Sequence, residues 1–161
     1  MKKQFRAPWD LLLTSLTVIV IAVLIGINYA TPGLITTLIT WGIILGTAAF
    51  GVYGYSVQNE KLKILRLGWS KDLSFSSIKK IEYTPNAMLG SIRTFGVGGL
   101  FCYLGYFKNS VLGSYKAYAT HRKRTVVVTT QDDDQIVLSP EKPKDFVETI
   151  KERMEQIEQE Q

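Results

Sequence analysis

The feature that most constrains this chain is a long stretch without charge near its N-terminus. No Asp, Glu, Lys, Arg or His lies between Asp10 and Glu60, in a chain of 161 residues. A soluble domain rarely tolerates so long an uncharged segment, because its surface needs charged side chains. A helix over residues 11–30 would measure about 30 Å, the thickness of the hydrocarbon core of a bilayer. The stretch therefore predicts helices that cross a membrane.

A turn at residues 31–33 divides this stretch in two. Pro32 disfavours a helical conformation in the residue before it, and Gly33 permits the chain to reverse. We expect a second membrane helix over residues 34–57, and thus a two-helix transmembrane hairpin. A cleaved signal peptide is the competing interpretation, because residues 1–10 are basic, but the apolar run is longer than a typical signal core.

Basic residues flank both predicted helices, whereas the turn between them carries none. The flanking residues are Lys2, Lys3, Arg6, Lys61, Lys63 and Arg66. Because basic segments stay on the cytoplasmic side, residues 1–10 are expected to form a cytoplasmic N-terminus. We therefore expect a multi-pass protein of the cell membrane with both termini in the cytoplasm.

Small residues recur every four positions in the two predicted helices. They are Ala22 and Gly26 in the first and Gly42 and Gly46 in the second. Small side chains let helix backbones approach closely. We expect these residues to pack the hairpin against itself, because a three-residue turn holds the helices together; a dimerisation seam is the alternative. Neither span contains Asp, Glu, Lys, Arg or His, so no proton or ion path is expected.

From residue 59 the hydrophobic pattern becomes typical of short strands. Strand patterns occur at residues 62–67, 69–75, 78–83, 114–120, 125–130 and 136–138. A helix is expected from about residue 143, because Pro143 suits a first helical turn. Its apolar stripe consists of Phe146, Ile150, Met154 and Ile157, and residues 155–161 form an acidic tail.

Four segments of this second part carry a family resemblance. They are LGWSKDLSFSSIKKIEY, RTFGVGGLFCYLGYFKN, GSYKAYAT and VVVTTQDDDQIVLSPEKPKDFVETI. Together they resemble the pleckstrin-homology-like (PH-like) domains of bacterial membrane proteins, over residues 59–154. The preceding hairpin is similar to the usual companion of these domains. The resemblance implies a membrane-anchored α+β protein with an antiparallel PH-like β-barrel or sandwich capped by a C-terminal helix. It implies no catalytic residues.

The second of these segments lies in a block rich in glycine and aromatic residues, residues 90–107. A phosphate loop is disfavoured, because Phe101 replaces the third glycine of the motif and the flanking strand and helix are missing. A third membrane span would be too short. We expect a long insertion with a strand whose aromatic side chains fill the barrel, and rank contact with the membrane interface second. The aromatic residues are Phe95, Phe101, Tyr103, Tyr106 and Phe107.

Basic residues outside the hairpin supply candidate contacts to an anionic lipid or a partner. They are Lys79, Lys80, Arg122, Lys123 and Arg124. Each contributes about 1 kcal/mol near an anionic leaflet. Because two helices already hold the chain, this attraction would orient the domain or select a partner. A solvated basic loop is the simpler interpretation.

No cluster of residues predicts catalysis. Cys102 and His121 stand alone, and the run Asp132–Asp134 lacks the alternating ligands of a calcium loop. We expect no enzymatic activity, cofactor, metal or nucleic-acid partner. The predicted function is a binding or assembly module at the inner leaflet whose partner is a protein, a second copy included. Recognition of anionic lipid headgroups by the basic loops is the alternative, and docking of a partner on the acidic helix is a third hypothesis.

Overall fold

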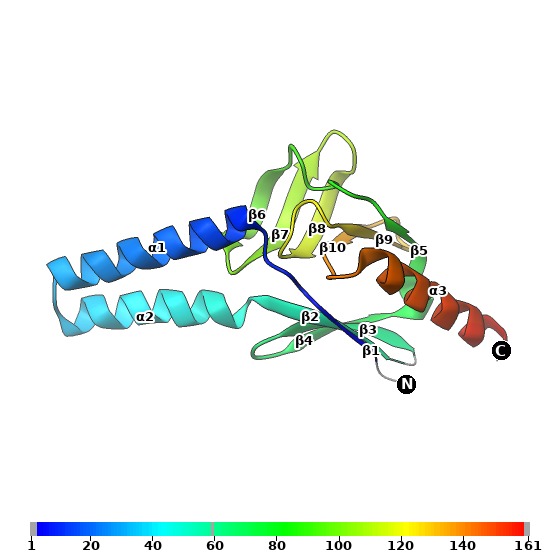
Figure 1. The fold of residues 1–161 in the computed structure, drawn as a ribbon, viewed down its shortest axis with the longest axis horizontal. Helices are drawn as coiled ribbons and strands as arrows, with labels where there is room; N and C mark the ends of the chain where they lie inside the picture. The colour runs from blue at the N-terminus through cyan, green and yellow to red at the C-terminus, as the bar shows by residue number, and fades with distance from the viewer. Residues whose placement is uncertain (1–2, 59, 160–161) are drawn as a thin grey trace.

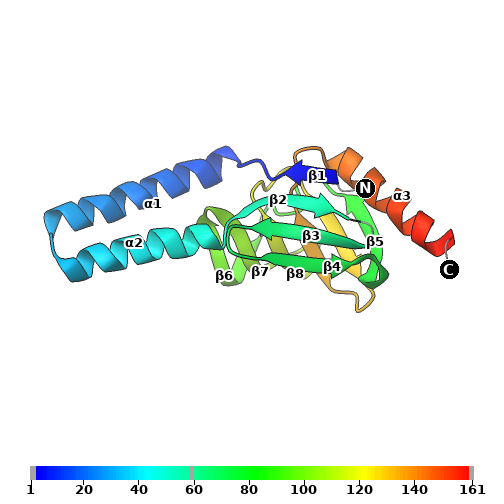
Figure 2. The same cartoon turned by 90° about the horizontal axis from the view of Figure 1, so that it is seen from below.

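The structure, a computed structural model, describes residues 3–58 and 60–159. Two β-sheets face each other, a pair of helices projects from one end of them, and a C-terminal helix lies toward the other end (Figures 1 and 2). The expected order of a helical hairpin, a β domain and a C-terminal helix is confirmed.

The projecting pair consists of α1 (Leu11–Ala30) and α2 (Leu34–Ala49). Among the described residues, α1 alone is long and apolar enough to span a membrane, with a mean hydropathy of 2.5. The prediction of a helix over 34–57 is wrong, because α2 ends at Ala49 and strand β2 (Val52–Val57) follows. This segment is uncharged throughout, but its backbone pairs with neighbouring strands on both sides.

The first sheet has four antiparallel strands. Their order is β1 (Lys3–Arg6), β2, β3 (Lys61–Arg66) and β4 (Ser70–Ser74). Strand β1 precedes the helical hairpin and β2 follows it, so that the hairpin connects two neighbouring strands. Residues 1–10 were expected to form a simple basic terminus, but Phe5 is buried in the core between the sheets.

The second sheet has six strands. Their bounds are β5 (Ile78–Tyr83), β6 (Ile92–Leu100), β7 (Cys102–Asn109), β8 (Gly113–Ala119), β9 (Val126–Thr130) and β10 (Gln135–Leu138). The order is β5-β9-β10-β8-β7-β6. A short 3-10 turn (Phe75–Ser77) leads into β5 from the first sheet.

Two details of the expected sheet are corrected. The sheets do not close into a barrel but form an open sandwich. The pairing is not wholly antiparallel either, because β10 lies between β8 and β9 and runs parallel to β8. Strand β10 follows β9 through a tight turn, which leaves it pointing in the same direction as β8.

Helix α3 (Pro143–Gln159) closes one end of the space between the sheets. Phe146 and Ile150 are fully buried, and Met154 and Ile157 pack against the same core. The predicted apolar stripe is confirmed. The helix continues through residues 155–159, so this part of the predicted acidic tail belongs to α3.

The second sheet is apolar on both faces. Its inner face meets the four-stranded sheet and α3. On its outer face, Tyr103, Phe107 and Tyr115 are buried with Met88 of the β5–β6 connection and Leu13 of α1. The first turn of α1 is therefore part of the domain core.

Tyr55 connects the two sheets through its buried side chain. Its hydroxyl donates a hydrogen bond to the carbonyl oxygen of Tyr118 in β8 (2.6 Å) and accepts one from the backbone N–H of Ser139 (3.0 Å). Its ring contacts Phe146 of α3. Burial raises the pKa of Tyr55 to about 12, so the hydroxyl stays protonated.

We expect Tyr55→Phe to lower the free energy of unfolding by about 1–3 kcal/mol, because it leaves the buried N–H of Ser139 without this partner. Tyr53→Phe is the matched control, since that ring is exposed and its hydroxyl bonds to Ala48 at the surface. Thermal unfolding of both variants in mild detergent measures the difference. Equal losses in the two variants would contradict the role given to Tyr55.

Candidate functional site

Asp10 organises the end of the domain from which the helices project. Its carboxylate caps α1 by accepting a hydrogen bond from the N–H of Leu13 (2.7 Å). It also accepts hydrogen bonds from the N–H of Arg122 (3.0 Å) and the hydroxyl of Tyr103 (3.2 Å). A negative charge at a helix N-terminus stabilises the helix. Through these three hydrogen bonds the Asp10 side chain connects α1, β7 and the β8–β9 loop. Burial and then the charge of Asp10 raise the pKa of Tyr103.

His121 shapes the basic loop between β8 and β9. Its Nδ1 accepts hydrogen bonds from the N–H groups of Lys123 (3.1 Å) and Arg124 (3.2 Å), which requires an unprotonated nitrogen. Burial lowers the pKa of His121, and the positive charges of Arg124 and Lys123 lower it further against the opposing effect of Asp10. The neutral ring therefore holds the loop in place, with the side chains of Lys123 and Arg124 exposed.

Lys79 and Lys80 are not part of this basic loop. Lys79 pairs with Asp133 in the exposed β9–β10 turn (2.6 Å), and Lys80 pairs with Glu82 (2.8 Å). In β5 these lysines align with the end of β9, whereas the basic loop precedes the start of β9. The five predicted contact cations thus divide between two ends of the sheet.

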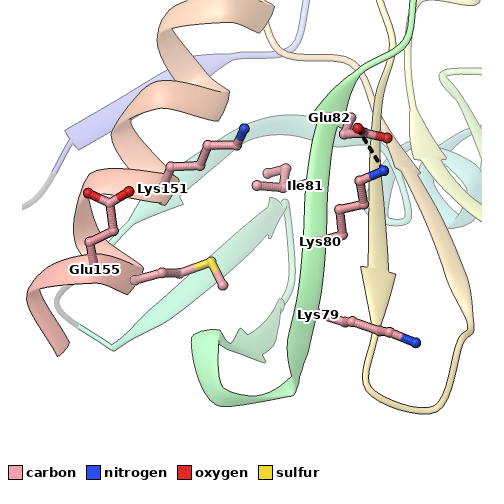
Figure 3. A pocket seen from close by; sticks show the side chains of 7 residues that line it. Lys79, Lys80, Ile81, Glu82, Lys151 and Glu155 are labelled. Carbon is pink, nitrogen blue, oxygen red and sulfur yellow. Dashed lines mark ion pairs between the residues drawn. The ribbon is translucent and has the colours of Figure 1, made fainter. Parts of the chain in front are cut away.

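The depression beside Lys79 and Lys80 has charges of both signs (Figure 3). It lies between β5 and α3 and is lined by Lys79, Lys80, Ile81, Glu82, Lys151, Met154 and Glu155. Because carboxylates stand among the ammonium groups, the net charge of this depression is small. It offers little selectivity for an anion.

The glycine-rich block forms an antiparallel hairpin of β6 and β7, with Phe101 at its turn. Gly96 and Gly105 lie opposite each other, with φ angles of 114° and 132°. A Cβ at either position would overlap a carbonyl oxygen of the opposite strand, so both positions require glycine. The two glycines let β6 and β7 approach closely next to a register shift in their pairing.

The five aromatic residues of the block do not fill a barrel together. Tyr103 and Phe107 are buried on the outer face of the sheet. Phe95 and Tyr106 are paired across the strands and are 75% and 48% exposed. Phe101 is half-buried and contacts Trp9 edge-on at the base of the helices. The prediction that these aromatic residues fill the barrel is wrong for Phe95 and Tyr106, because strand alternation directs neighbouring side chains to opposite faces.

The small residues of the helices do not close the hairpin. A Cβ added to Gly26, Gly42 or Gly46 would meet no atom within 4 Å. Ala22 is also exposed. The expectation that these residues pack the two helices against each other is therefore wrong. Near its tip, the hairpin is connected instead by a hydrogen bond from Thr37 Oγ1 to Asn28 Oδ1 (3.0 Å).

Three cations that sequence analysis did not propose as a contact site converge on one aromatic ring. Relative to the ring centre of Tyr118, the Arg66 guanidinium lies at 4.9 Å, Lys71 Nζ at 5.3 Å and Lys116 Nζ at 5.9 Å. They come from β3, β4 and β8, which are separated in sequence. In the sequence, Lys116 and Tyr118 alternate with residues that become buried, which indicates that the two share one face of a strand. This pattern does not reveal that Arg66 and Lys71 of the other sheet lie beside them.

Cys102 is buried and its Sγ donates to the carbonyl oxygen of Phe50 (3.6 Å). Burial raises the pKa of this thiol to about 11, so it is a poor nucleophile. Within residues 3–58 and 60–159, no group of three or more His, Cys, Asp or Glu side chains is placed to hold a metal ion.

Comparison with known families adds to this geometry. A family model described as a bacterial PH domain matches residues 53–154, well over half of the chain. The chain belongs to the bacterial PH-domain family. The PH domain begins within β2 and not at residue 59, which agrees with the buried position of this strand between β1 and β3. No curated protein and no solved structure matches the chain.

The single histidine of the chain gives a direct test of the loop geometry of the PH domain. We expect the NMR titration of His121 to give a pKa below the ordinary value of about 6.5, because protonation breaks both bonds to Nδ1. The free energy of unfolding should then decrease as the pH falls below about 6.5, where the unfolded state binds the proton more readily.

His121→Asn is the matched variant, because its side chain retains an acceptor but does not titrate. The difference in stability between wild type and His121→Asn should shrink as the pH falls from 7 to 5. A His121 pKa at or above the ordinary value would contradict the described loop.

Proposed function

We propose that this chain is a non-enzymatic integral membrane protein whose PH domain lies at the cytoplasmic leaflet and binds a partner protein. In this proposal α1 and α2 cross the cell membrane as a hairpin. The proposal rests on three features: the apolar surface of the helices, the strands that bracket them, and an edge strand of the PH domain whose first half is uncovered.

The helices present apolar side chains that nothing in the described chain covers. Examples are Val18 and Ile19 of α1, 60% and 59% exposed, and Leu34 and Ile35 of α2, 76% and 74% exposed. Exposed apolar surface of this extent requires a lipid or protein environment. Helix α2 is about 24 Å long, so that the bilayer would thin slightly or the aromatic residues after the helix would complete the span.

The pairing of β1 with β2 supports a hairpin that enters and leaves the membrane on one side. Each end of the hairpin is attached to this ladder within a few residues. A signal peptide cleaved after α1 would remove β1 and expose the core around Phe5. The chain is thus better suited to keep both helices than to lose the first.

Aromatic and basic residues at the base of the helices support the cytoplasmic side. Trp9 contacts Phe101 and Phe50 contacts Trp69, pairs suited to the membrane interface. The basic loop Arg122–Arg124 lies at the start of α1, whereas the turn at the far end of the helices is uncharged. This asymmetry follows the positive-inside pattern.

We expect Thr31→Cys to react with a membrane-impermeant maleimide in intact cells. Lys144→Cys should react after permeabilisation and not before, because α3 lies with the PH domain. Mass shifts of the labelled protein measure both reactions, and buried Cys102 provides a low background. Labelling in the reverse pattern, or of both positions in intact cells, would contradict the orientation.

The proposed partner site is the exposed edge of strand β6. It forms one end of the six-stranded sheet, and its Ile92 and Phe95 are 73% and 75% exposed. Near the other end of β6, Thr17 of α1 donates a hydrogen bond to the carbonyl of Gly99 (3.4 Å). The first half of β6 thus remains open to pairing with an extended segment of a partner.

The other sheet edges are less suited to a partner. Strand β5 carries Lys79, Lys80 and Glu82 and lies against α3. Strand β4 carries Lys71 and Asp72, and β1 is four residues long. Charged and short edges resist pairing with another chain. Lipid recognition by the basic loops has less support, because Lys79 and Lys80 are paired with carboxylates at the other end of the sheet.

We expect a photoreactive phenylalanine analogue at Phe95 to give protein adducts in the membrane. The same analogue at Tyr83, in the charged edge strand β5, should give few. Adducts at Phe95 should be lost in Ile92→Lys, because a charge beside the edge opposes strand addition, and retained in Val111→Lys, which places the same charge at an exposed turn. Gel shifts and mass spectrometry of the adducts provide the measurement.

Adducts between two copies of the chain would specify self-association as the form of assembly. Adducts that persist in Ile92→Lys, or lipid adducts alone at Phe95, would contradict a partner at β6.

A further inference from the structure

The inner face of the six-stranded sheet is wider than the sheet that covers it. Leu104 and Tyr118 are paired across β7 and β8 and pack against the shared core. One pair further along the same face, Tyr106 and Lys116 are opposite each other, and Tyr106 is 48% exposed. At Tyr106 the inner face of the six-stranded sheet is therefore only partly covered.

The cations around Tyr118 lie at this boundary. Lys116 Nζ is 4.9 Å from the ring centre of Tyr106 and donates a hydrogen bond to its hydroxyl (3.3 Å). Arg66 and Lys71 approach Tyr118 from the opposite sheet. Three positive side chains from three strands therefore gather around Tyr118, and one of them, Lys116, also contacts the half-exposed Tyr106.

No carboxylate neutralises these cations in the part of the chain that the structure describes. The ion pairs of the neighbouring strands join Asp72 to Lys61 (2.9 Å) and Lys63 (3.9 Å), on the opposite face of β4. Arg66 Nε is buried and makes no hydrogen bond. Gathering like charges costs free energy, and a buried donor without a partner adds to that cost. A bound anion would relieve both.

The ammonium group of Lys116 stays charged at this position. Burial alone would lower its pKa, but the hydrogen bond to Tyr106 and the nearby Tyr118 raise it above the ordinary value. The amine can therefore act as a permanent positive group.

We propose that Arg66, Lys71 and Lys116 form a binding site for a phosphate-type anion. The planar guanidinium of Arg66 suits two oxygen atoms of one phosphate, and the lysines supply charge from the other sides. The hydroxyl of Tyr106 adds a neutral donor at the rim. Lipid headgroups and soluble phosphate esters share this chemistry.

The surroundings favour a phospholipid headgroup as the source. Arg66 is followed by Leu67 and Trp69, 68% and 44% exposed, at the end of the domain from which the helices project. Tyr106, 48% exposed, continues the inner face beyond Lys116. An anionic lipid would place its phosphate among the cations and its apolar part along this surface. This site is separate from the basic loop Arg122–Arg124.

Titration of the full chain in dodecyl maltoside tests the site. The three probes are dihexanoyl phosphatidylglycerol, dihexanoyl phosphatidylcholine and inorganic phosphate, with amide NMR shifts as the readout. We expect saturable shifts at Lys71 and Lys116 with phosphatidylglycerol, weakened by added salt. Arg66→Gln/Lys71→Gln/Lys116→Gln should reduce the affinity at least about tenfold.

The matched control is Lys142→Gln/Lys144→Gln/Lys151→Gln, which removes the same charge from α3 and its approach and should leave the affinity unchanged. If the triple variant fails to fold, Lys116→Gln and Tyr106→Phe provide milder tests, each expected to weaken binding several-fold. Equal binding of inorganic phosphate at the same residues would retain the site and overturn the lipid source. Shifts confined to Lys123 and Arg124, or no saturable shift, would overturn the site itself. None of these outcomes depends on a partner at β6, which the crosslinking at Phe95 tests separately.

Discussion

The ladder between β1 and β2 constrains every other part of this structure. It pairs residues on the two sides of the helical hairpin, from Lys3 with Val57 to Arg6 with Gly54. The N–H of Ala7 extends it by donating to the carbonyl of Tyr53 (3.1 Å). Because both ends of the hairpin are attached to one ladder, the helices leave the domain and return to it at a single place. The hairpin is therefore a projection of the sandwich and not a flexible leader.

The attachment also places particular groups beside the helices. Asp10 caps α1 and accepts hydrogen bonds from Tyr103 and the β8–β9 loop, so one carboxylate connects the helix start to the PH domain. Thr17 continues the connection to the turn of β6 and β7. If the helices insert into a membrane, the end of the PH domain next to them would lie at the membrane surface. The aromatic and basic side chains at that end are held in a fixed orientation by these contacts.

Alternation along the chain was sufficient to predict most strands and the helix from Pro143, because each buries one face and exposes the other. It was insufficient at residues 50–57, where an uncharged apolar segment suits a helix or a strand equally well. Pairing with β1 and β3 decides that segment, and partners distant in sequence leave no local signal. The same limit applies to the sites. From the sequence, Lys79 and Arg122 were both candidates for one basic surface, but they lie at opposite ends of β9. Arg66 and Lys116 showed no relation in the sequence, yet both lie beside Tyr118.

The sequence by itself determined the apolar hairpin, most strand positions and the apolar stripe of α3, because these follow from local composition and period. The resemblance of four of its segments to known domains indicated the family. Only the tertiary structure decided that the hairpin is bracketed by paired strands, that the sandwich stays open beside β4, and that Phe95 faces solvent while Phe107 is buried. Each of these depends on which strands become neighbours. Strand neighbours are joined by backbone hydrogen bonds between residues far apart in the chain. Every residue except proline can donate such a bond, so the local sequence does not specify the partner.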